Sequence, residues 1–282
     1  MCGCLGKCRL SDVCLHHEDP SAFYTSPWLQ KQALFLLYRV LFAAAVLSIL
    51  LRDVLTWYGE FPDRQWAATA SHWSFTVLTA HGLWSAAVCI HQSYRARRVD
   101  QQDLTGSPET LHWSLKASWV ILDCSFAGAI ITSILFGALL GATYDWDARN
   151  ILLHVVNSVL VIIDILVSGF PCRFLHVVYP MIFIIVYIIF TVVYWAAGGI
   201  YEGNSYIYTF LDYSGNPALA VGTAIGFILS LSVSHLIVYG LGKGREALAR
   251  HVRERSSGQD TTTDHNNIPT LIRIDQIATA RP

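Results

Sequence analysis

Six long apolar blocks dominate the 282-residue sequence and limit what the chain can fold into. Each block approaches the roughly 20 apolar residues that an α-helix needs to cross a hydrocarbon core about 30 Å thick. A single span in lipid satisfies its backbone hydrogen bonds only as a helix, and a barrel would show alternating strands of about ten residues. The sequence therefore predicts an all-α polytopic membrane bundle of about six transmembrane helices, at 33–51, 72–90, 119–140, 151–169, 177–199 and 217–242.

Composition supports lipid as the solvent around this bundle. Hydrophobic residues make up 54% of the chain and charged residues only 14%, against about 25% charged residues in a typical soluble domain. The net charge of −1 creates no long-range field that would attract nucleic acid. The lipid bilayer is the expected partner, nucleic acid is not, and the protein is expected to be integral to the plasma membrane or the endoplasmic reticulum.

Lysine and arginine near the predicted spans indicate the orientation, because cytoplasmic segments carry an excess of these residues. One side collects most of them, namely Lys7, Arg9, Lys31, Arg95, Arg97, Arg98, Lys116, Arg173, Lys243, Arg245, Arg250, Arg253 and Arg255. Both termini are therefore predicted to be cytoplasmic. The chain divides into a cysteine-rich leader at 1–31, a six-helix transmembrane domain at 32–242, and a basic, then disordered, tail at 243–282.

The leader places Cys2, Cys4 and Cys8 beside a lysine at the cytoplasmic membrane surface. Cysteines in this setting are candidates for reversible S-palmitoylation, and unmodified thiols are the alternative. A closed metal site would need a fourth ligand, which Cys14 or a nearby histidine would have to supply. We assign no metal and no cofactor to the chain.

Three ionisable residues fall inside predicted spans, at similar depth in the cytoplasmic half of the membrane. Charged groups at this depth require a partner or a function. The simpler interpretation is a structural ion pair that locks the bundle, formed by Arg39 with Asp123 or Asp164. The alternative is a proton or ion relay, which would usually show further carboxylates along a path.

A second polar set lies at matching depth in the opposite half. Thr79 is in the second span, and His154, Asn157 and Ser158 in the fourth share one helix face at i, i+3 and i+4. Histidine could act as the base that activates a threonine nucleophile, with Asn157 and Ser158 in support. In the alternative interpretation the threonine bonds its own i−4 carbonyl and the histidine joins two helices.

These residues also carry a family resemblance. The chain resembles the rolling stone proteins at Tyr38-Arg39, Leu78-Thr79, His154 through Asn157-Ser158 to Asp164, Pro171, Tyr179-Pro180, Ile207-Tyr208 and Leu211-Asp212-Tyr213. It departs from the family pattern at Ala80-His81, where Asn-Trp is expected, and at Tyr213, where tryptophan is usual. The founding insect member is associated with myoblast fusion. The resemblance implies a multi-pass membrane protein in cell fusion or muscle development.

The rolling stone proteins are in turn distantly similar to the androgen-induced membrane proteins, which hydrolyse fatty acid esters of hydroxy fatty acids. That group uses a threonine nucleophile and a histidine ten residues before an acidic residue. In this sequence Thr79 matches the threonine, and Asp164 follows His154 by ten residues. This resemblance implies an alternative function, an intramembrane lipid-ester hydrolase with Thr79 as nucleophile, His154 as base and a fatty-acyl ester as substrate.

Overall fold

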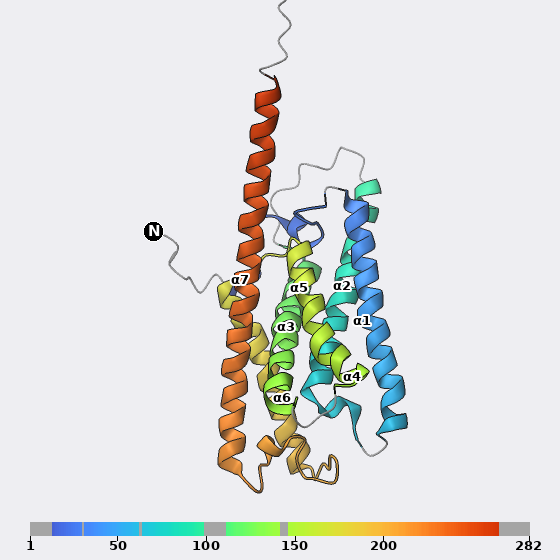
Figure 1. Ribbon diagram of the computed structural model, residues 1–282, viewed down its shortest axis with the longest axis vertical. Helices are drawn as coiled ribbons and strands as arrows, with labels where there is room; N and C mark the ends of the chain where they lie inside the picture. The colour runs from blue at the N-terminus through green and yellow to red at the C-terminus, as the bar shows by residue number, and fades with distance from the viewer. Residues whose placement is uncertain (1–12, 30, 62–63, 99–110, 142–145, 265–282) are drawn as a thin grey trace, which may run out of the picture. The chain divides into compact units, whose positions relative to one another are not determined.

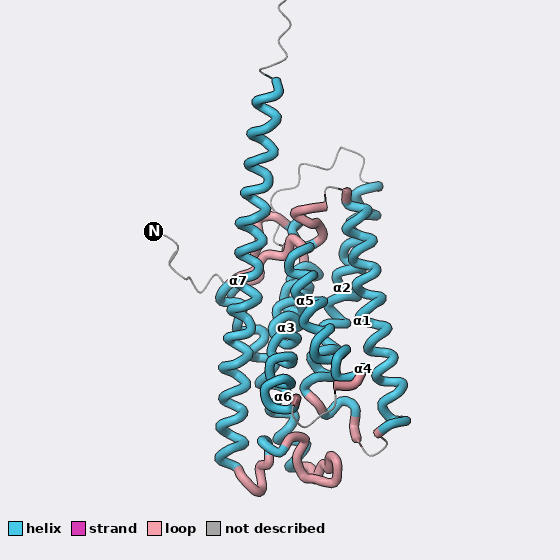
Figure 2. Tube along the Cα trace, in the orientation of Figure 1, coloured by secondary structure: helices cyan, strands magenta, loops and turns pink. Residues whose placement is uncertain are grey.

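The computed structural model describes residues 13–29, 31–61, 64–98, 111–141 and 146–264. Helices account for almost all regular structure in this part of the chain (Figure 2), so the predicted all-α class is confirmed. Among these described residues, six helical segments are long and apolar enough to cross a membrane, as predicted. Contacts divide the chain into two units, Met1–Lys243 and Gly244–Pro282.

The long helices are α1 (Gln32–Glu60), α2 (Ala70–Arg98), α3 (Trp113–Leu135), α5 (Asn157–Val167), α6 (Val178–Ala196) and α7 (Pro217–Asp264). Shorter elements connect them: η2 (Pro20–Phe23), η3 (Trp66–Ala68), η4 (Phe136–Leu140), α4 (Ala148–Asn150), η5 (Ile151–Val156), η6 (Phe174–Val177) and η7 (Thr209–Leu211). Two of these, η4 and η5, are π-helical turns. They extend α3 and open α5 respectively.

Two helices continue beyond their predicted ends. The apolar block of α1 was expected to end at residue 51, but the helix runs to Glu60 because partners in other elements satisfy the polar side chains of its last turns. The last apolar block was expected to end at residue 242, ahead of a basic and then disordered tail, and α7 continues from it through the basic stretch to Asp264. Its sequence after Gly244 contains arginine, glutamate, alanine and leucine, which favour helix, and no proline before the helix ends.

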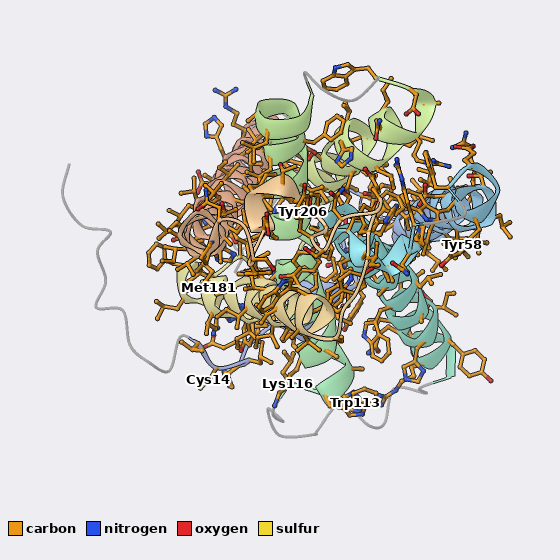
Figure 3. The ribbon with its side chains drawn as sticks, turned by 90° about the horizontal axis from the view of Figure 1, so that it is seen from below. Cys14, Tyr58, Trp113, Lys116, Met181 and Tyr206 are labelled. Carbon is orange, nitrogen blue, oxygen red and sulfur yellow. The ribbon has the colours of Figure 1, made fainter. Side chains whose placement is uncertain are left out.

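The central helix of the first unit is α3, which contacts α2, α5 and α6. In the most apolar part of the span that contains α3, 61% is buried inside the protein. The corresponding share for the span that contains α6 is 17%. Figure 1 shows α1 and α2 running side by side, in agreement with their contacts. The outward apolar side chains of α6 and α1 indicate a lipid-facing surface. Tyr58 of α1 and Trp113 of α3 are exposed and lie at the outside of the bundle in Figure 3.

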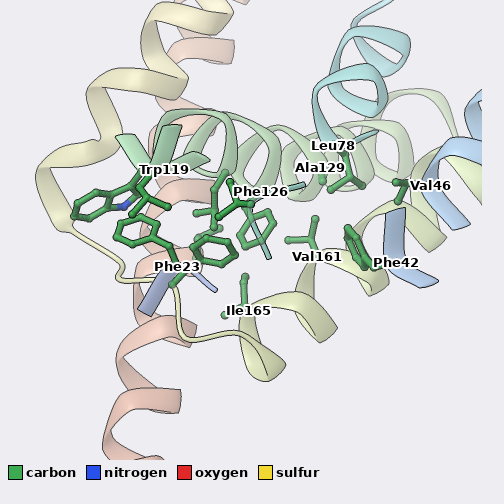
Figure 4. Packing of buried hydrophobic residues seen from close by; sticks show 14 of the residues in the cluster. Phe23, Phe42, Val46, Leu78, Trp119, Phe126, Ala129, Val161 and Ile165 are labelled. Carbon is green, nitrogen blue, oxygen red and sulfur yellow. The ribbon is translucent and has the colours of Figure 1, made fainter. Parts of the chain in front are cut away.

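The core contains a cluster of aromatic rings at one end of the bundle. Trp119 of α3 packs edge-to-face against Phe23 of the leader, with the ring centroids 5.2 Å apart. Phe126 lies in the same cluster (Figure 4). Between α1 and α2, a Cβ atom at Gly82 would lie 2.9 Å from a methyl carbon of Val46, so glycine permits the close approach of these helices.

The described part of the leader is held against the same end of the bundle by hydrogen bonds. The Ser26 hydroxyl donates to the Val167 carbonyl at 2.6 Å, at the last turn of α5. The Arg173 guanidinium donates to the carbonyls of Cys14, at 3.0 Å, and His16. These bonds connect the leader to segments that follow it by more than a hundred residues, so this part of the leader belongs to the folded unit.

Candidate functional site

The first polar network joins α1, α2 and α5 at full burial. An Arg39 nitrogen lies 2.8 and 3.0 Å from the two carboxylate oxygens of Asp164, and both side chains have no exposed surface. The second terminal nitrogen of Arg39 donates to the Ser168 hydroxyl at 2.6 Å. Of the two carboxylates considered for Arg39, the structure places Asp164 against it. A buried charge is tolerated when it is paired and hydrogen-bonded in this way.

Two further residues complete the shell of Asp164. The Tyr38 hydroxyl donates to one carboxylate oxygen at 2.9 Å, and His81 Nε2 lies 2.9 Å from the other. The Ser85 hydroxyl lies 3.4 Å from His81 Nδ1, so the order serine, histidine, aspartate resembles a hydrolytic triad. Arg39 already neutralises the carboxylate, all three groups are fully buried, and none lines the two cavities described below. This arrangement is therefore structural in the present conformation.

Asp123 contacts His176 and not Arg39, the partner considered from the sequence. His176 Nδ1 lies 2.8 Å from a carboxylate oxygen of Asp123, and Arg39 does not contact that carboxylate. The His176 ring also packs on Trp119 with the centroids 4.4 Å apart. Asp123 therefore connects α3 to the segment before α6. Asp123 is therefore not the partner of Arg39, because η6 brings the histidine to α3 while Arg39 faces α5.

A second ionic network lies near the opposite ends of α1 and α2, and the sequence did not suggest it. Arg149 Nε lies 3.0 Å from one carboxylate oxygen of Asp53, and the other oxygen lies 3.1 Å from His72 Nε2. The Trp66 indole donates to Asp53 at 2.6 Å. One of the two terminal nitrogens of Arg149 lies 2.8 Å from a Glu60 carboxylate oxygen. Asp53 lies outside the predicted first span, so the hydropathy of the sequence did not indicate that it is buried within α1.

Thr79 has a backbone partner. Its hydroxyl donates to the Phe75 carbonyl at 2.9 Å, four residues earlier, and lies 3.4 Å from the Val46 carbonyl of α1. Thr79 is buried and lines neither cavity described below. No hydrogen bond joins its hydroxyl to His154, although both residues lie in the described part of the chain. The side chain of Thr79 therefore points toward α1.

His154 lies in the π-helical turn η5 and faces α3. Its ring stacks on Phe136 with the centroids 3.8 Å apart and the planes 7° apart. Nδ1 is buried and has no hydrogen-bond partner. Phe136 begins the other π-helical turn, η4, so both stacked rings are presented by widened turns. Such turns occur frequently at functional sites.

The two residues proposed to support His154 behave differently from each other. Ser158 lies 2.6 Å from the Ser133 hydroxyl and 3.1 Å from the Ala129 carbonyl of α3. Asn157 has no exposed surface, and neither its amide oxygen nor its amide nitrogen has a hydrogen-bond partner. A buried side-chain amide without partners is uncommon in native structures. Ser158 therefore connects α5 to α3, and Asn157 retains its full hydrogen-bonding capacity.

Two cavities have His154 in their walls. One, of about 70 Å³, has a mostly apolar lining from α2, α3, α6 and α7. The other, of about 120 Å³, lies beside the second ionic network under the loop that follows α6. His154, Phe136, Ser71 and Tyr208 contribute to the walls of both. This pair of cavities is the candidate site, and among the described residues no group of three His, Cys, Asp or Glu side chains gathers there or elsewhere as a metal site would.

The lipidation candidates Cys2, Cys4 and Cys8 lie outside the described residues. Cys14, the next cysteine, is exposed, and the labelled view along the helices places it near the edge of the bundle (Figure 3). Cys89, Cys124 and Cys172 are buried. S-palmitoylation of the leader therefore stays a prediction.

Comparison with known proteins identifies the chain's relatives. The family model described as "Protein rolling stone" matches residues 9–257. The protein of that name from Drosophila melanogaster is 31% identical over 230 residues, which cover 78% of this chain and 82% of the Drosophila protein. No solved structure matches the chain. The match spans the whole membrane bundle, and the chain therefore belongs to the rolling stone family.

Proposed function

We propose that this protein acts in cell fusion, in particular the fusion of myoblasts during muscle development. The observation that carries the proposal is the match to the Drosophila protein across 82% of that protein's length, together with the association of the founding insect member with fusion. The bundle has six apolar helices and short connecting loops in its described part. A role at the membrane itself suits this architecture better than adhesion through a large extracellular surface.

A content-mixing assay tests this proposal. Two populations of cultured myoblasts carry different cytoplasmic dyes, and the gene for this chain is removed from one population or from both. We expect removal to reduce mixing and the wild-type chain to restore it. The control is Asp164→Asn, which the buried ion pair predicts to be poorly folded and therefore unable to restore mixing. Undiminished fusion after removal from both populations would contradict the proposal.

The second candidate is an intramembrane lipid-ester hydrolase, favoured by the unpartnered Nδ1 of His154 in the wall of both cavities. In this reaction the Thr79 oxygen attacks the ester carbonyl and His154 accepts its proton. The alkoxide leaving group then takes that proton, and water later hydrolyses the acyl-threonine. The Thr79 hydroxyl must first give up its bond to the Phe75 carbonyl. The candidate thus requires a rotation at this position of α2.

A fluorophosphonate probe tests the hydrolase candidate, because an activated hydroxyl displaces fluoride and retains the phosphonyl group. Membranes that contain wild type, Thr79→Ala, His154→Ala or the control Thr76→Ala are treated in parallel. Thr76 lies on the same helix and also donates to a carbonyl four residues earlier. We expect labelling of wild type and Thr76→Ala only. Absence of labelling in folded wild type, or equal labelling of all four proteins, would refute hydrolysis through this pair.

A further inference from the structure

The smaller cavity has the lining of a site for a hydrocarbon chain. Aliphatic and aromatic side chains of α3, α6 and α7 form most of its wall, including Ile131, Phe183 and Phe227. Gly128 leaves room at its α2 side, since a Cβ there would lie 3.2 Å from the Ser74 hydroxyl. At the other end Leu139 is 49% exposed on the apolar surface of the bundle. A chain could therefore reach this cavity directly from the bilayer.

The larger cavity lies at the ends of the helices and is more polar. Its wall includes Thr69 and His72 from the start of α2, Arg149 from α4 and Tyr201 from the loop after α6. The smaller cavity shares wall residues with it and reaches Phe183 in the first half of α6. A molecule that filled both would have its polar end near the membrane surface and its chain along the helices, as a bilayer lipid does.

Unpartnered polar atoms lie in the walls of the two cavities. Nδ1 of His154 and the hydroxyl of Ser74 are buried and have no hydrogen-bond partner. Ser74 lines the smaller cavity, and His154 lines both. Buried polar groups without partners are destabilising, and ligand sites commonly place a few such groups within an apolar wall. These two atoms can accept and donate hydrogen bonds to the hydroxyl or carbonyl groups of a ligand.

The charged side chains around the larger cavity already have partners. The Asp147 carboxylate caps α4 by accepting from the Asn150 N–H at 2.7 Å. Arg64 pairs with Glu202 at 3.0 Å, and Arg149 pairs with Asp53 and Glu60. An anionic head group would be repelled by these carboxylates. A cationic head group would compete with the arginines that already form ion pairs with them. Transfer of an unpaired charge into such a site is strongly unfavourable. The lining therefore favours a head group that forms hydrogen bonds and carries no net charge.

We propose that the paired cavities bind one single-chain lipid with an uncharged, hydroxyl-bearing head group, of the monoacylglycerol class. Part of the acyl chain occupies the cavity between α3, α6 and α7, and the rest of it extends past the exposed Leu139 into the bilayer. The head group occupies the cavity beside Arg149. His154, which lines both cavities, hydrogen-bonds the polar group that follows the chain. Binding requires no reaction at Thr79 and no role in fusion, so the proposal stands apart from both functions above.

Photo-crosslinking of the purified full chain tests this site. The probe is 1-O-hexadecylglycerol with a diazirine in the chain, because its ether bond cannot be hydrolysed. We expect adducts on peptides that contain 128–139 or 183–187, and a labelling decrease of about tenfold in Thr132→Phe, which fills the smaller cavity. Ile134→Phe is the matched control, because Ile134 is 49% exposed on the same helix and lines neither cavity. Labelling that is equal in both variants would overturn the proposal.

Competition with unlabelled lipids tests the head group. We expect 1-O-hexadecylglycerol to compete about tenfold better than hexadecanoate or hexadecyltrimethylammonium, a difference of about 1.4 kcal/mol. In His154→Phe, which keeps an aromatic ring against Phe136, this preference should narrow while crosslinking to the chain cavity persists. The His154→Phe arm keeps the test decisive if Thr132→Phe does not fold. A preference for either charged competitor, or an unchanged preference in His154→Phe, would overturn the proposal.

Discussion

Replacement of Asp164 by asparagine would leave Arg39 with a positive charge and no counter-charge at full burial. Four side chains converge on this carboxylate: Tyr38, Arg39, His81 and Ser168. An asparagine amide has one acceptor oxygen, and its nitrogen is a donor that would face some of these donors. The substitution therefore removes the counter-charge of Arg39 and mismatches part of the hydrogen-bond network.

The magnitude follows from the burial of both partners. Neither Arg39 nor Asp164 has exposed surface, and loss of one partner from a buried ion pair lowers the free energy of unfolding by about 3 to 5 kcal/mol. For a chain in this size range, that corresponds to a decrease in melting temperature of about 6 to 20 °C. Removal of both charges should be less harmful, because apolar side chains can replace a buried pair at little net loss.

Thermal unfolding in detergent, followed by the fraction that stays monodisperse on gel filtration, measures the effect. The variants are Asp164→Asn, Arg39→Met, the double variant Arg39→Met with Asp164→Leu, and the control Glu254→Gln, which removes one charge at an exposed position. We expect both single variants to be less stable than the double variant and the control to equal wild type. Losses in the single variants below about 1 kcal/mol, or strictly additive losses in the double variant, would refute the reasoning.

Three further predictions concern packing and the other ionic groups. Gly169→Ala should lower the free energy of unfolding by about 1 to 3 kcal/mol, because its Cβ would lie 2.9 Å from the Ala22 carbonyl oxygen. The control is Gly222→Ala, whose Cβ would have no atom within 4 Å and which should raise the melting temperature slightly. Asp123→Asn should lower stability by only about 1 kcal/mol in the same assay, because an amide oxygen can still accept from His176; a larger loss would mean that the charge itself matters. Arg149→Met should lower the melting temperature in the same assay, because the buried carboxylate of Asp53 loses its counter-charge. An unchanged melting temperature would contradict the stabilising role of the second ionic network.

The six helices were predictable because lipid requires each span to be a continuous apolar helix, which is a local property of the sequence. For Arg39 the sequence narrowed the partner to two carboxylates, because a buried arginine requires a counter-charge. The second ionic network was not predictable from hydropathy. Asp53 is tolerated inside α1 only because Arg149 and His72 reach it from other elements. That condition depends on tertiary structure and leaves no pattern around Asp53 itself.

Thr79 and His154 show that the sequence did not predict how each helix is rotated about its own axis. Their depths in the membrane follow from span boundaries, but the direction in which each side chain points depends on how its helix is rotated. Thr79 faces α1 at the Val46 carbonyl, whereas His154 faces α3, where its ring stacks on Phe136. The π-helical turn at His154 also departs from the 3.6-residue period that depth and face arguments assume. Matching depth is therefore insufficient for a catalytic pair, and labelling that is lost in both Thr79→Ala and His154→Ala would require α2 to rotate when substrate binds.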